Sequence, residues 1–485
     1  MENRTLAGGV YALDHIMSCA RKALPAWKAM PVKARLHYLG RLRMLLIRDM
    51  DEWIELLKIE CGKTPMDALM SDIYTTVDAI AYYEKHASRI LRSRRVRTPL
   101  VFIGSKSYRT YEPFGVLSVI APWNFPLQLA LIPVISGLAA GNVVLLKPSE
   151  KLPQINAKLI NTLQEAGFPK GVCSVIQGGR ETVEHLIEMR PDKIFFTGGS
   201  EAGRNVLQRA AAHFIPCDME LSGKDPMIVC DDASIERAAR AAVWGAFLHS
   251  GQVCVSVERV YVHASIYDEF VRNVVIQTNS LSQSADEWAD VGAMTTEEGW
   301  HRVKEQLEDA VLKGASVQAG GLTADAIIPI FPPTVLTGVT NDMQLMKEET
   351  FGPLLPIMAF ETDEEAIALA NQSDYGLSAS IFTSNLSRGR SIANRLETGS
   401  CAINDVVRHI SNMNLPFGGV KQSGFGRTHG PEGLLAFCQS KAIMMKSGRK
   451  PKQINWYPYK QDSFESIKKG LRMLYGRGVK KEDNT

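Results

Sequence analysis

The chain has 485 residues. Because a domain typically has roughly 150 residues, we expect two or three domains. Hydrophobic residues make up 45% and charged residues 22%, a balance that excludes a disordered or fibrous protein. The formal net charge of +3 is unevenly placed, because residues 446–485 hold eleven Lys or Arg against four Asp or Glu. The body is therefore mildly acidic and the tail basic, and we expect no nucleic-acid partner.

The eight cysteines show no spacing typical of a zinc site or a disulfide framework. They lie at positions 19, 61, 173, 217, 230, 254, 401 and 438, and no two form a C-x-x-C pair. A reducing compartment fits this usage, so we expect a cytoplasmic protein without a metal site. The first residues include Glu2 and Asp14 and no apolar run, so no secretory signal is predicted.

Residues 10–92 are predicted to form amphipathic helices. Apolar side chains recur there mostly at steps of three and four, at Leu39, Leu42, Leu46, Trp53, Leu56 and Leu57. No catalytic chemistry is evident in this segment. Residues 95–113 then change to short alternating stretches such as SKSYRTYEP, which predict an extended hairpin or arm.

One uncharged segment, residues 129–146, is almost long enough to cross a membrane. Its sequence instead favours a buried helix, turn and strand, with Pro133 near the start of the helix, a turn at Gly141-Asn142 and a β-branched run that ends at Lys147.

From residue 116 the chain alternates between apolar strands and helices. The predicted strands are 116–121, 143–147, 172–177, 193–197 and 215–220, and the predicted helices are 127–140, 154–166, 181–189 and 201–212. This pattern predicts an α/β fold with a parallel sheet covered by helices on both faces, and a nucleotide site at the carboxyl ends of its strands.

A second α/β alternation begins at residue 226 and runs to about 430. It contains a strand at PMIVC, a helix from Ser234 to Leu248, a loop and a strand at 257–263. Residues 436–447 are predicted to return as a strand beside the 95–113 arm. The arm and this strand would leave unpaired edges that a partner chain could cover.

The loop SGQVCV, residues 250–255, places Cys254 after a glycine and between two valines. A small, polar approach of this kind lets a substrate reach the sulfur. Most cysteines in a reducing cell are inert core residues, and this stretch alone favours the interpretation that Cys254 is one of them.

Two further polar side chains follow predicted buried strands. Asn124, in APWNFP, is a candidate hydrogen-bond donor that is held rigidly between two prolines, and a turn asparagine that caps its own backbone is an equal alternative. Glu220, in MELSGKDP, has apolar neighbours that would raise its pKa, as a general base requires. An exposed glutamate at a domain boundary is the plainer interpretation.

Two other strand ends are candidates for nucleotide binding. Lys147 and Glu150, three residues apart, could hold the hydroxyls of a ribose, although a surface ion pair explains them equally well. Gly198 and Gly199 precede Ser200, a predicted N-cap, and Gly203, so the start of this helix could bind an anion. An ordinary glycine turn before a capped helix is the alternative.

Together with KEETFGP (residues 347–353) and LPFGGVKQSGFGR (residues 415–427), these ordered stretches resemble the aldehyde dehydrogenase superfamily. The resemblance covers roughly residues 10–447. It implies a Rossmann-like dinucleotide-binding domain, a second α/β catalytic domain and a small bridging or oligomerisation β-arm, which is the aldehyde dehydrogenase fold.

The resemblance also implies a role for each matching residue. Cys254 is similar to the nucleophile, Asn124 to the oxyanion donor and Glu220 to the base that activates water. The cofactor contacts implied are Pro122, Trp123, Lys147, Glu150, Gly198, Gly199, Ser200, Gly203, Leu221, Glu349 and Phe351. The substrate funnel implied is Phe125, Val253, Val255 and Phe417. One departure is Gly199, where many relatives have serine directly after the first glycine.

The predicted domains are residues 1–94 with 114–222 for NAD(P) binding, 223–430 for catalysis, 95–113 with 431–449 for the arm, and 450–485 for a basic tail.

We expect the enzyme to oxidise an aldehyde to its carboxylate through a thioester. The aldehyde is expected to be hydrophobic because the funnel residues are mostly apolar. NAD is expected first because Glu150 would repel a 2′-phosphate, and NADP is kept as the alternative cofactor. A CoA-acylating dehydrogenase and a non-catalytic structural or membrane-scaffolding relative are the alternatives, and a homodimer or tetramer is expected.

The tail contains one amphipathic segment, residues 463–476. Phe464, Ile467, Leu471 and Leu474 would share a helical face, with Lys and Arg elsewhere. Peripheral contact with the inner membrane surface is one interpretation. Packing on a neighbouring subunit and a solvated basic tail are the others.

Overall fold

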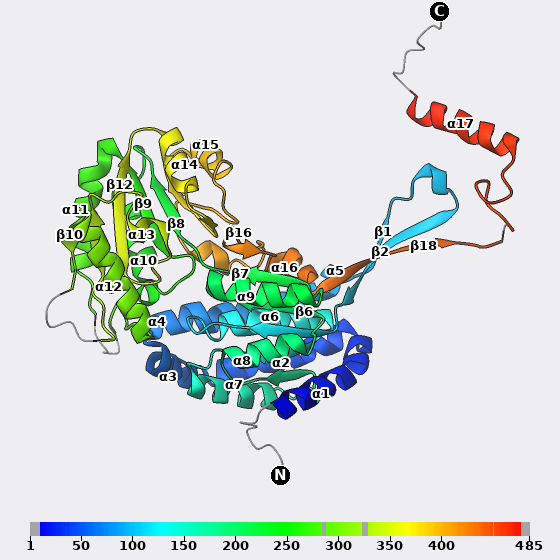
Figure 1. The fold of residues 1–485 in the computed structure, drawn as a ribbon, viewed down its shortest axis with the longest axis horizontal. Coiled ribbons are helices and arrows are strands. Elements are labelled where there is room, and N and C mark those ends of the chain that lie inside the picture. The colour runs from blue at the N-terminus through cyan, green and yellow to red at the C-terminus, as the bar shows by residue number, and fades with distance from the viewer. Residues whose placement is uncertain (1–9, 284–287, 323–327, 450, 477–485) are drawn as a thin grey trace, which may run out of the picture. The chain divides into compact units, whose positions relative to one another are not determined.

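The computed structural model describes residues 10–283, 288–322, 328–449 and 451–476 (Figure 1). The chain divides into two compact units. The first comprises residues 1–92 and 111–439, and the second comprises residues 93–110 and 440–485. The finer four-part domain division stays a prediction.

Helices fill the N-terminal part of the first unit, as the apolar periodicity predicts. They are α1 (Val10–Ala29), α2 (Val32–Arg48), α3 (Met50–Cys61), α4 (Pro65–Asp67), the π-helical turn η1 (Ala68–Tyr74) and α5 (Thr75–Ile90). Leu39, Leu42 and Leu46 are fully buried, whereas Leu56 is only half-buried. Gly62 caps the C-terminus of α3, and its φ of 68° places it in the left-handed region that glycine adopts most readily.

A six-stranded sheet follows, in the order β17-β7-β6-β3-β4-β5. Its parallel strands are β3 (Val116–Ile120), β4 (Val143–Lys147), β5 (Cys173–Val175), β6 (Lys193–Thr197) and β7 (Cys217–Glu220), and β17 (Gly424–Phe425) pairs with β7 in the antiparallel sense. The helices between the strands are α6 (Gln128–Ala140), α7 (Pro153–Glu165), α8 (Arg180–Glu188) and α9 (Ser200–Ala212). The predicted Rossmann-like alternation is confirmed, with β5 and β7 shorter than predicted.

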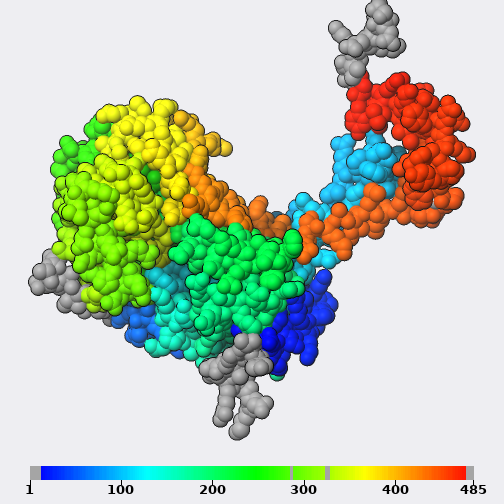
Figure 2. Space-filling model, in the orientation of Figure 1, coloured from blue at the N-terminus to red at the C-terminus, as the bar shows by residue number. Residues whose placement is uncertain are grey.

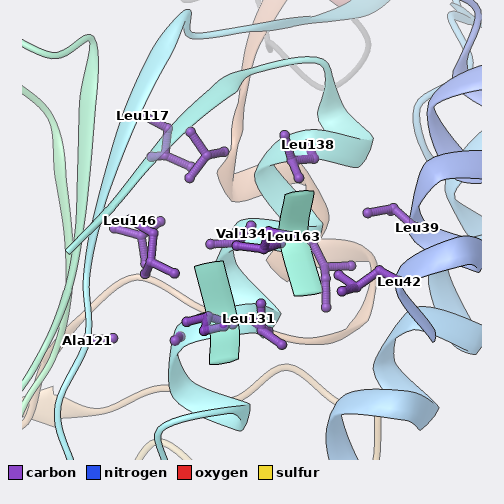
Figure 3. Close-up of a cluster of buried hydrophobic side chains, with 14 of the residues drawn as sticks. Leu39, Leu42, Leu117, Ala121, Leu131, Val134, Leu138, Leu146 and Leu163 are labelled. Carbon is purple, nitrogen blue, oxygen red and sulfur yellow. The ribbon is translucent and has the colours of Figure 1, made fainter. Parts of the chain in front are cut away.

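The segment 129–146 is buried within this unit. After α6, Gly141 turns the chain with a φ of 101° and β4 begins two residues later. Figure 3 shows Leu131, Val134 and Leu138 of α6 between strand residues such as Leu146 and helix α2. Because each buried leucine contributes about 1.5–3 kcal/mol, this packing explains why an uncharged helix belongs in the core.

A seven-stranded sheet forms the other half of the first unit, in the order β10-β11-β12-β9-β8-β14-β15. The strands are β8 (Asp225–Val229), β9 (Val257–His263), β10 (Ser316–Ala319), β11 (Thr334–Thr337), β12 (Leu354–Phe360), β14 (Ser380–Phe382) and β15 (Ala402–Ile403). All neighbours are parallel except β10 and β11. This is the second α/β alternation that the sequence predicts.

The remaining elements of the first unit surround this sheet or follow it. They are α10 (Ile235–Phe247), η3 (Leu248–Gly251), η4 (Ala264–Ile266), α11 (Tyr267–Asn279), α12 (Glu297–Leu312), α13 (Gln344–Lys347), α14 (Asp363–Asn371), β13 (Tyr375–Gly376), α15 (Leu386–Ala393), η5 (Arg408–Ser411), β16 (Val420–Lys421) and α16 (Gly430–Ala436).

A three-stranded sheet, in the order β1-β2-β18, continues into the second unit. Its strands are β1 (Arg94–Val96), β2 (Ser105–Pro113) and β18 (Cys438–Lys446), with the turn η2 (Leu100–Phe102) at the tip of the hairpin. The prediction that residues 436–447 return beside the arm is confirmed. The helix α17 (Gln461–Tyr475) follows, and none of the helices in the described residues is both long and apolar enough to cross a bilayer.

Candidate active site

Two cavities of the first unit meet at the same side chains. The larger has a volume of about 610 Å³ and the smaller about 210 Å³. Cys254 and Glu220 line both cavities, and Asn124 lines the smaller one. Three polar groups from distant parts of the chain therefore converge on one place, as the proposed chemistry requires.

Cys254 lies in the loop between η3 and β9, with a half-buried side chain. Burial raises the pKa of its thiol well above the usual value, and nearby carboxylates, Glu220 first, raise it further. The thiol therefore keeps its proton at neutral pH until a base removes it. Val253 lines the larger cavity, whereas Val255 is 2% exposed, packs in the hydrophobic core and lines neither cavity.

The backbone before Cys254 is held in an uncommon conformation. The helix α10 ends at Phe247, one residue earlier than predicted, and His249 and Ser250 then adopt φ values of 49° and 53°. Such left-handed residues persist only where their surroundings fix them. Here the main-chain N–H of His249 donates to Asp67 at 3.2 Å, and the hydroxyl of Ser250 donates to the oxygen of Gly292 at 2.7 Å.

Asn124 is joined to this loop by its side chain. Its amide Nδ2 donates to the main-chain oxygen of Gln252 at 3.0 Å, so it does not cap its own turn. The Gln252 side chain is fully buried. It accepts from the N–H of Thr295 at 2.9 Å and donates to the oxygen of His249 at 3.1 Å. The amide and the cysteine loop are thus fixed relative to one another before any substrate arrives.

Glu220 ends β7, and its side chain is buried rather than exposed. Burial raises the pKa of its carboxyl to about 7, and its Oε1 atom has no hydrogen-bond partner. A carboxyl with this pKa can both accept and release a proton near neutral pH, which is what a general base needs.

The turn between β6 and α9 lies beside the smaller cavity. Gly198 and Gly199 line that cavity, and Gly199, not Ser200, is the N-cap residue of α9. The prediction that Ser200 caps the helix is wrong, because its hydroxyl donates to the oxygen of Gln422 at 3.3 Å. Gly203 packs so closely against Leu221 that an added Cβ would lie 2.4 Å from the leucine Cδ2.

Lys147 and Glu150 form an ion pair of 2.6 Å at the end of β4. Lys147 is buried, and 51% of the Glu150 side chain is exposed. Burial, the largest single effect, raises the pKa of the Glu150 carboxyl, but the hydrogen bond from Lys147, a backbone hydrogen bond and the charges of Lys147 and Lys151 together lower it further, so the net shift is downward. Neither residue lines the smaller cavity.

Glu349 and Phe351 also line the smaller cavity. Burial raises the pKa of Glu349 to about 7, and its Oε1 accepts from the N–H of Gly223 at 2.9 Å. The Phe351 ring meets Trp123 edge-on with centroids 5.5 Å apart, and Pro122 and Leu221 complete this part of the lining. Arg302 of α12 also lines the cavity, and no motif marked it in the sequence.

The larger cavity is mainly apolar. Phe125 and Phe417, two predicted funnel residues, line it. Further apolar lining comes from Met66, Met70, Tyr74, Leu129, Ile132, Trp244, Leu248, Val407 and Ile410. The first three belong to the N-terminal helical segment, in which the sequence showed no chemistry, because helical periodicity does not reveal which exposed residues a later domain faces.

A buried charged cluster contacts residues 125–128, directly after Asn124, and was also missed from the sequence. Lys63 and Asp72, both fully buried, form an ion pair. The carboxylate of Asp72 accepts from the N–H groups of Leu127 and Gln128 at 3.0 and 3.3 Å, and Lys63 lies 3.9 Å above the ring of Phe125. The cluster thus supports the segment that carries Asn124.

Comparison with known proteins agrees with this geometry. Residues 5–443 match the profile of the aldehyde dehydrogenase family. The chain belongs to the aldehyde dehydrogenase family. It is accordingly an oxidoreductase that acts on aldehydes, and the resemblance seen in the sequence is confirmed.

Three relatives illustrate the range of this aldehyde dehydrogenase family. A 4,4'-diapolycopene aldehyde oxidase from Methylomonas sp. is 42% identical over 94% of this chain and 86% of its own. A putative NADP(+) succinate-semialdehyde dehydrogenase from Mycobacterium ulcerans is 36% identical over 87% and 82%. The NAD+ complex of an aldehyde dehydrogenase from Bacillus cereus is 32% identical, with a TM-score of 0.86 over 90% of this chain and 89% of that one.

Proposed function

We propose that this aldehyde dehydrogenase oxidises a hydrophobic aldehyde to its carboxylate with NAD, through a thioester on Cys254. The observation that carries the proposal is that Cys254 and Glu220 line both cavities, with Asn124 in the smaller one. The larger cavity would receive the aldehyde and the smaller one the reactive end of the dinucleotide.

The smaller cavity and the turn beside it offer polar groups and open space for part of a dinucleotide. A Cβ added at Gly199 would have no atom within 4 Å, so the start of α9 is open. The buried hydroxyl of Thr197, which lines the cavity, has no hydrogen-bond partner. A helix start attracts phosphate through its dipole and its first-turn N–H groups, so Gly198, Gly199 and Ser200 would lie beside the pyrophosphate. The N–H of Gly198 already donates to the oxygen of Glu220 at 3.1 Å, and that of Ser200 to the Ser222 hydroxyl at 3.3 Å.

Other residues would hold the remaining parts of the dinucleotide. Lys147 and Glu150 would bind the adenine ribose, and Glu349 and Phe351 the nicotinamide ribose and ring. The half-exposed Glu150 carboxylate favours NAD because it would repel the 2′-phosphate of NADP. The relatives bind or are named for both cofactors, NAD+ in the Bacillus complex and NADP(+) in the mycobacterial name.

The first step is attack by the Cys254 sulfur on the aldehyde carbon, with loss of the thiol proton to a base. The thiol proton passes to solvent water in the open cavity. Glu220, which lines both cavities and has a pKa of about 7, thus stays free to accept a proton from water in the later hydrolysis step. As the carbon becomes tetrahedral, its oxygen gains negative charge. The Asn124 amide and the Cys254 main-chain N–H would stabilise that charge, each donor contributing about 10²–10³ in rate.

The nicotinamide ring, when bound, supplies the acceptor for the hydride that leaves the tetrahedral carbon. The substrate then remains joined to Cys254 as a thioester. Glu220 takes a proton from water, the resulting hydroxide attacks the thioester carbonyl, and the Cys254 thiolate leaves as the carboxylate forms. Asn124 stabilises the oxyanion of this second step as well.

The lining of the larger cavity supports an apolar substrate. Its charged residues include the carboxylates Asp67 and Asp405, which would repel the anionic end of a semialdehyde such as succinate semialdehyde. Arg408 also lines the cavity, but it lies 4.0 Å from Asp405 and its side chain is 72% exposed. Among the described lining residues, therefore, no cation without a neighbouring carboxylate is available to bind the carboxylate of such a substrate.

Two other functions are distinguished by a single set of assays. A CoA-acylating enzyme would need coenzyme A for turnover and would not need Glu220 as a base, and a structural relative would show no turnover. We expect steady NADH formation without coenzyme A, with kcat/KM rising as the aldehyde chain lengthens.

Variants test the roles directly. Cys254→Ala should abolish NADH formation, and Glu220→Gln should give one burst of NADH and then stall as acyl-enzyme. Cys19→Ala is a matched control, since Cys19 is a half-buried thiol of α1 that lines neither cavity. Full turnover by Cys254→Ala, or strict dependence on coenzyme A, would reject the proposal.

We also propose that the protein forms a homodimer or tetramer through the three-stranded sheet. β18 is an edge strand of that sheet, and Ile443, Met444 and Met445 on it are exposed. Unpaired strand edges readily add a strand from another chain. Light scattering of the purified protein measures the assembly, and a monomer at micromolar concentration would contradict it.

A further inference from the structure

The helix α17 exposes a complete apolar face. Phe464, Ile467, Leu471 and Leu474 follow one another at steps of three or four, which places them on one side of the helix. Their exposed fractions are 62%, 42%, 60% and 43%, and α17 has no buried residue. In Figure 2 the red atoms of this helix are open to view. Helices of soluble proteins normally bury such a face, so this one lacks its partner.

A second apolar group lies at the tip of the hairpin between β1 and β2, in the same unit. Leu100, Val101, Phe102 and Ile103 are consecutive and exposed, by 65%, 74%, 44% and 76%. Four adjacent apolar side chains at a turn do not stabilise the hairpin itself. Contiguous exposed apolar groups of this kind mark a binding surface.

Amphipathic aromatic side chains accompany these two groups. Trp456, Tyr457 and Tyr459, in the segment before α17, are exposed by 53%, 79% and 69%. Tryptophan and tyrosine combine an apolar ring with a polar atom, and they are enriched where a protein meets the boundary between lipid and water.

The charge of this unit indicates what covers its apolar groups. Residues 93–110 contain five Lys or Arg and no Asp or Glu, and residues 440–485 contain twelve Lys or Arg against four acidic residues. In α17 itself, Lys468, Lys469 and Arg472 lie beside the apolar face. Their long side chains can keep the charge at the headgroups while the stems contact apolar surface.

A protein partner fits these features less well than lipid does. Lysine is depleted at the centres of protein interfaces, and Lys468 and Lys469 lie beside the apolar face of α17. An apolar face flanked by lysine and arginine is the pattern of a helix that lies in the plane of an anionic membrane.

We propose that the second unit docks the protein on an anionic lipid bilayer, through the apolar face of α17 together with the hairpin tip at residues 100–103. Both elements would enter the headgroup region while the basic side chains contact lipid phosphates. The proposal concerns residues outside both cavities and does not depend on the aldehyde chemistry.

Flotation of the full chain with lipid vesicles tests this surface. The probes are vesicles of phosphatidylcholine alone and vesicles with about 30% phosphatidylserine, each at about 0.1 M and about 0.5 M NaCl. We expect flotation with the anionic vesicles at low salt, and at least a tenfold weaker partition with neutral vesicles or high salt. Equal partition into both kinds of vesicle, or none into either, would overturn the proposal.

Single substitutions separate the two elements. Leu471→Glu on α17 and Val101→Glu at the hairpin tip should each weaken partition at least tenfold. The matched control is Leu386→Glu, because Leu386 is a leucine of the first unit with a similar exposure, 65%. Circular dichroism checks that each variant is folded.

Light scattering on the same variants tests the competing occupant, a second copy of this chain. We expect the oligomeric state to stay unchanged in Leu471→Glu and Val101→Glu. If either variant still partitions like the unaltered chain, or if either dissociates an oligomer while the unaltered chain does not float, the two-part lipid surface is rejected.

Discussion

The side-chain nitrogen of Asn124 lies 3.0 Å from the main-chain oxygen of Gln252 and donates a hydrogen bond to it. The two residues come from different halves of the first unit, one after β3 and the other just before Cys254. This bond fixes the amide against the loop of the nucleophile, so the proposed oxyanion donors need no rearrangement when substrate binds.

Removing that amide should lower the rate much more than the stability. Asn124→Ala deletes a proposed oxyanion donor, and we expect kcat to fall about 10²–10³-fold. Asn156→Ala is a matched control, since Asn156 is also buried and donates to a main-chain oxygen, that of Ser149, at 2.7 Å. Steady-state kinetics and thermal melts should show similar destabilisation but a rate loss only in Asn124→Ala. Equal kcat values in the two variants would remove Asn124 from the mechanism.

The kcat should also depend on the position of the Cys254 main chain, which a single added methyl group would displace. A Cβ added at Gly223 would lie 2.0 Å from the Cys254 carbonyl oxygen, so Gly223→Ala must displace the loop. We expect kcat to fall at least tenfold, because an error of about 1 Å in a catalytic group can reduce rates 10²-fold. Gly470→Ala is the control, because nothing lies within 4 Å of its added Cβ. Unchanged kcat in Gly223→Ala would show that the loop tolerates the shift.

The local pattern of the sequence was sufficient for the elements that carry these groups. The buried strand that ends at Lys147 is an apolar run in the sequence, and the glycine-bearing loop around Cys254 separates a helix from a strand. Such signals are local, because strand and helix periodicity depend on neighbours in the chain. The sequence therefore placed the loops correctly at the ends of the strands.

Side-chain environments depend on residues far away in the chain and were predicted less well. Val255 was expected in the funnel, yet its loop turns it into the core. Ser200 was expected to cap α9, yet its hydroxyl donates a hydrogen bond to the main-chain oxygen of Gln422, more than two hundred residues later. The Lys63–Asp72 pair could not be found either, because nothing local distinguishes a buried charge from an exposed one on a helix.

The carboxyl of Glu220 should make stability depend on pH. Its pKa is about 7 in the folded protein, above the value of about 4.3 expected when unfolded, so the folded state holds the proton more tightly. This contribution is present below about pH 4 and is lost as the pH rises through 7. Relative to wild type, Glu220→Gln should gain about 3 kcal/mol between pH 5 and pH 8.

Urea unfolding at several pH values measures this difference. Glu364→Gln, at an exposed glutamate of α14, should follow wild type throughout. If Glu220→Gln also follows wild type between pH 5 and pH 8, the buried carboxyl does not titrate as proposed.

The preference of the enzyme for NAD over NADP should depend on Glu150. Glu150→Gln removes the negative charge opposite the proposed site of the 2′-phosphate while the side chain keeps its size. We expect the KM for NADP to fall about fivefold and that for NAD to change little, as one half-exposed charge contributes about 1 kcal/mol. Initial rates with each cofactor measure the ratio, with Glu364→Gln as the control. An unchanged ratio would mean that Glu150 does not meet the adenine ribose.

The buried ion pair of Lys63 and Asp72, which contacts residues 125–128, should be the most sensitive of these sites to loss of one partner. Lys63→Met leaves the Asp72 carboxylate buried without its cation, and we expect a loss of about 3–5 kcal/mol in the free energy of unfolding. The double variant Lys63→Met with Asp72→Asn removes both charges and should recover part of that loss. Arg240→Met, which breaks an exposed pair with Glu236, should change stability by less than about 1 kcal/mol.

Urea unfolding of these variants and of Asp72→Asn alone gives the coupling between Lys63 and Asp72. Because Asp72 also holds the N–H groups of Leu127 and Gln128, Lys63→Met should lower kcat through displacement of the Asn124 segment. Additive effects of the two substitutions, with kcat unchanged, would mean that the pair neither stabilises the loop nor positions the amide.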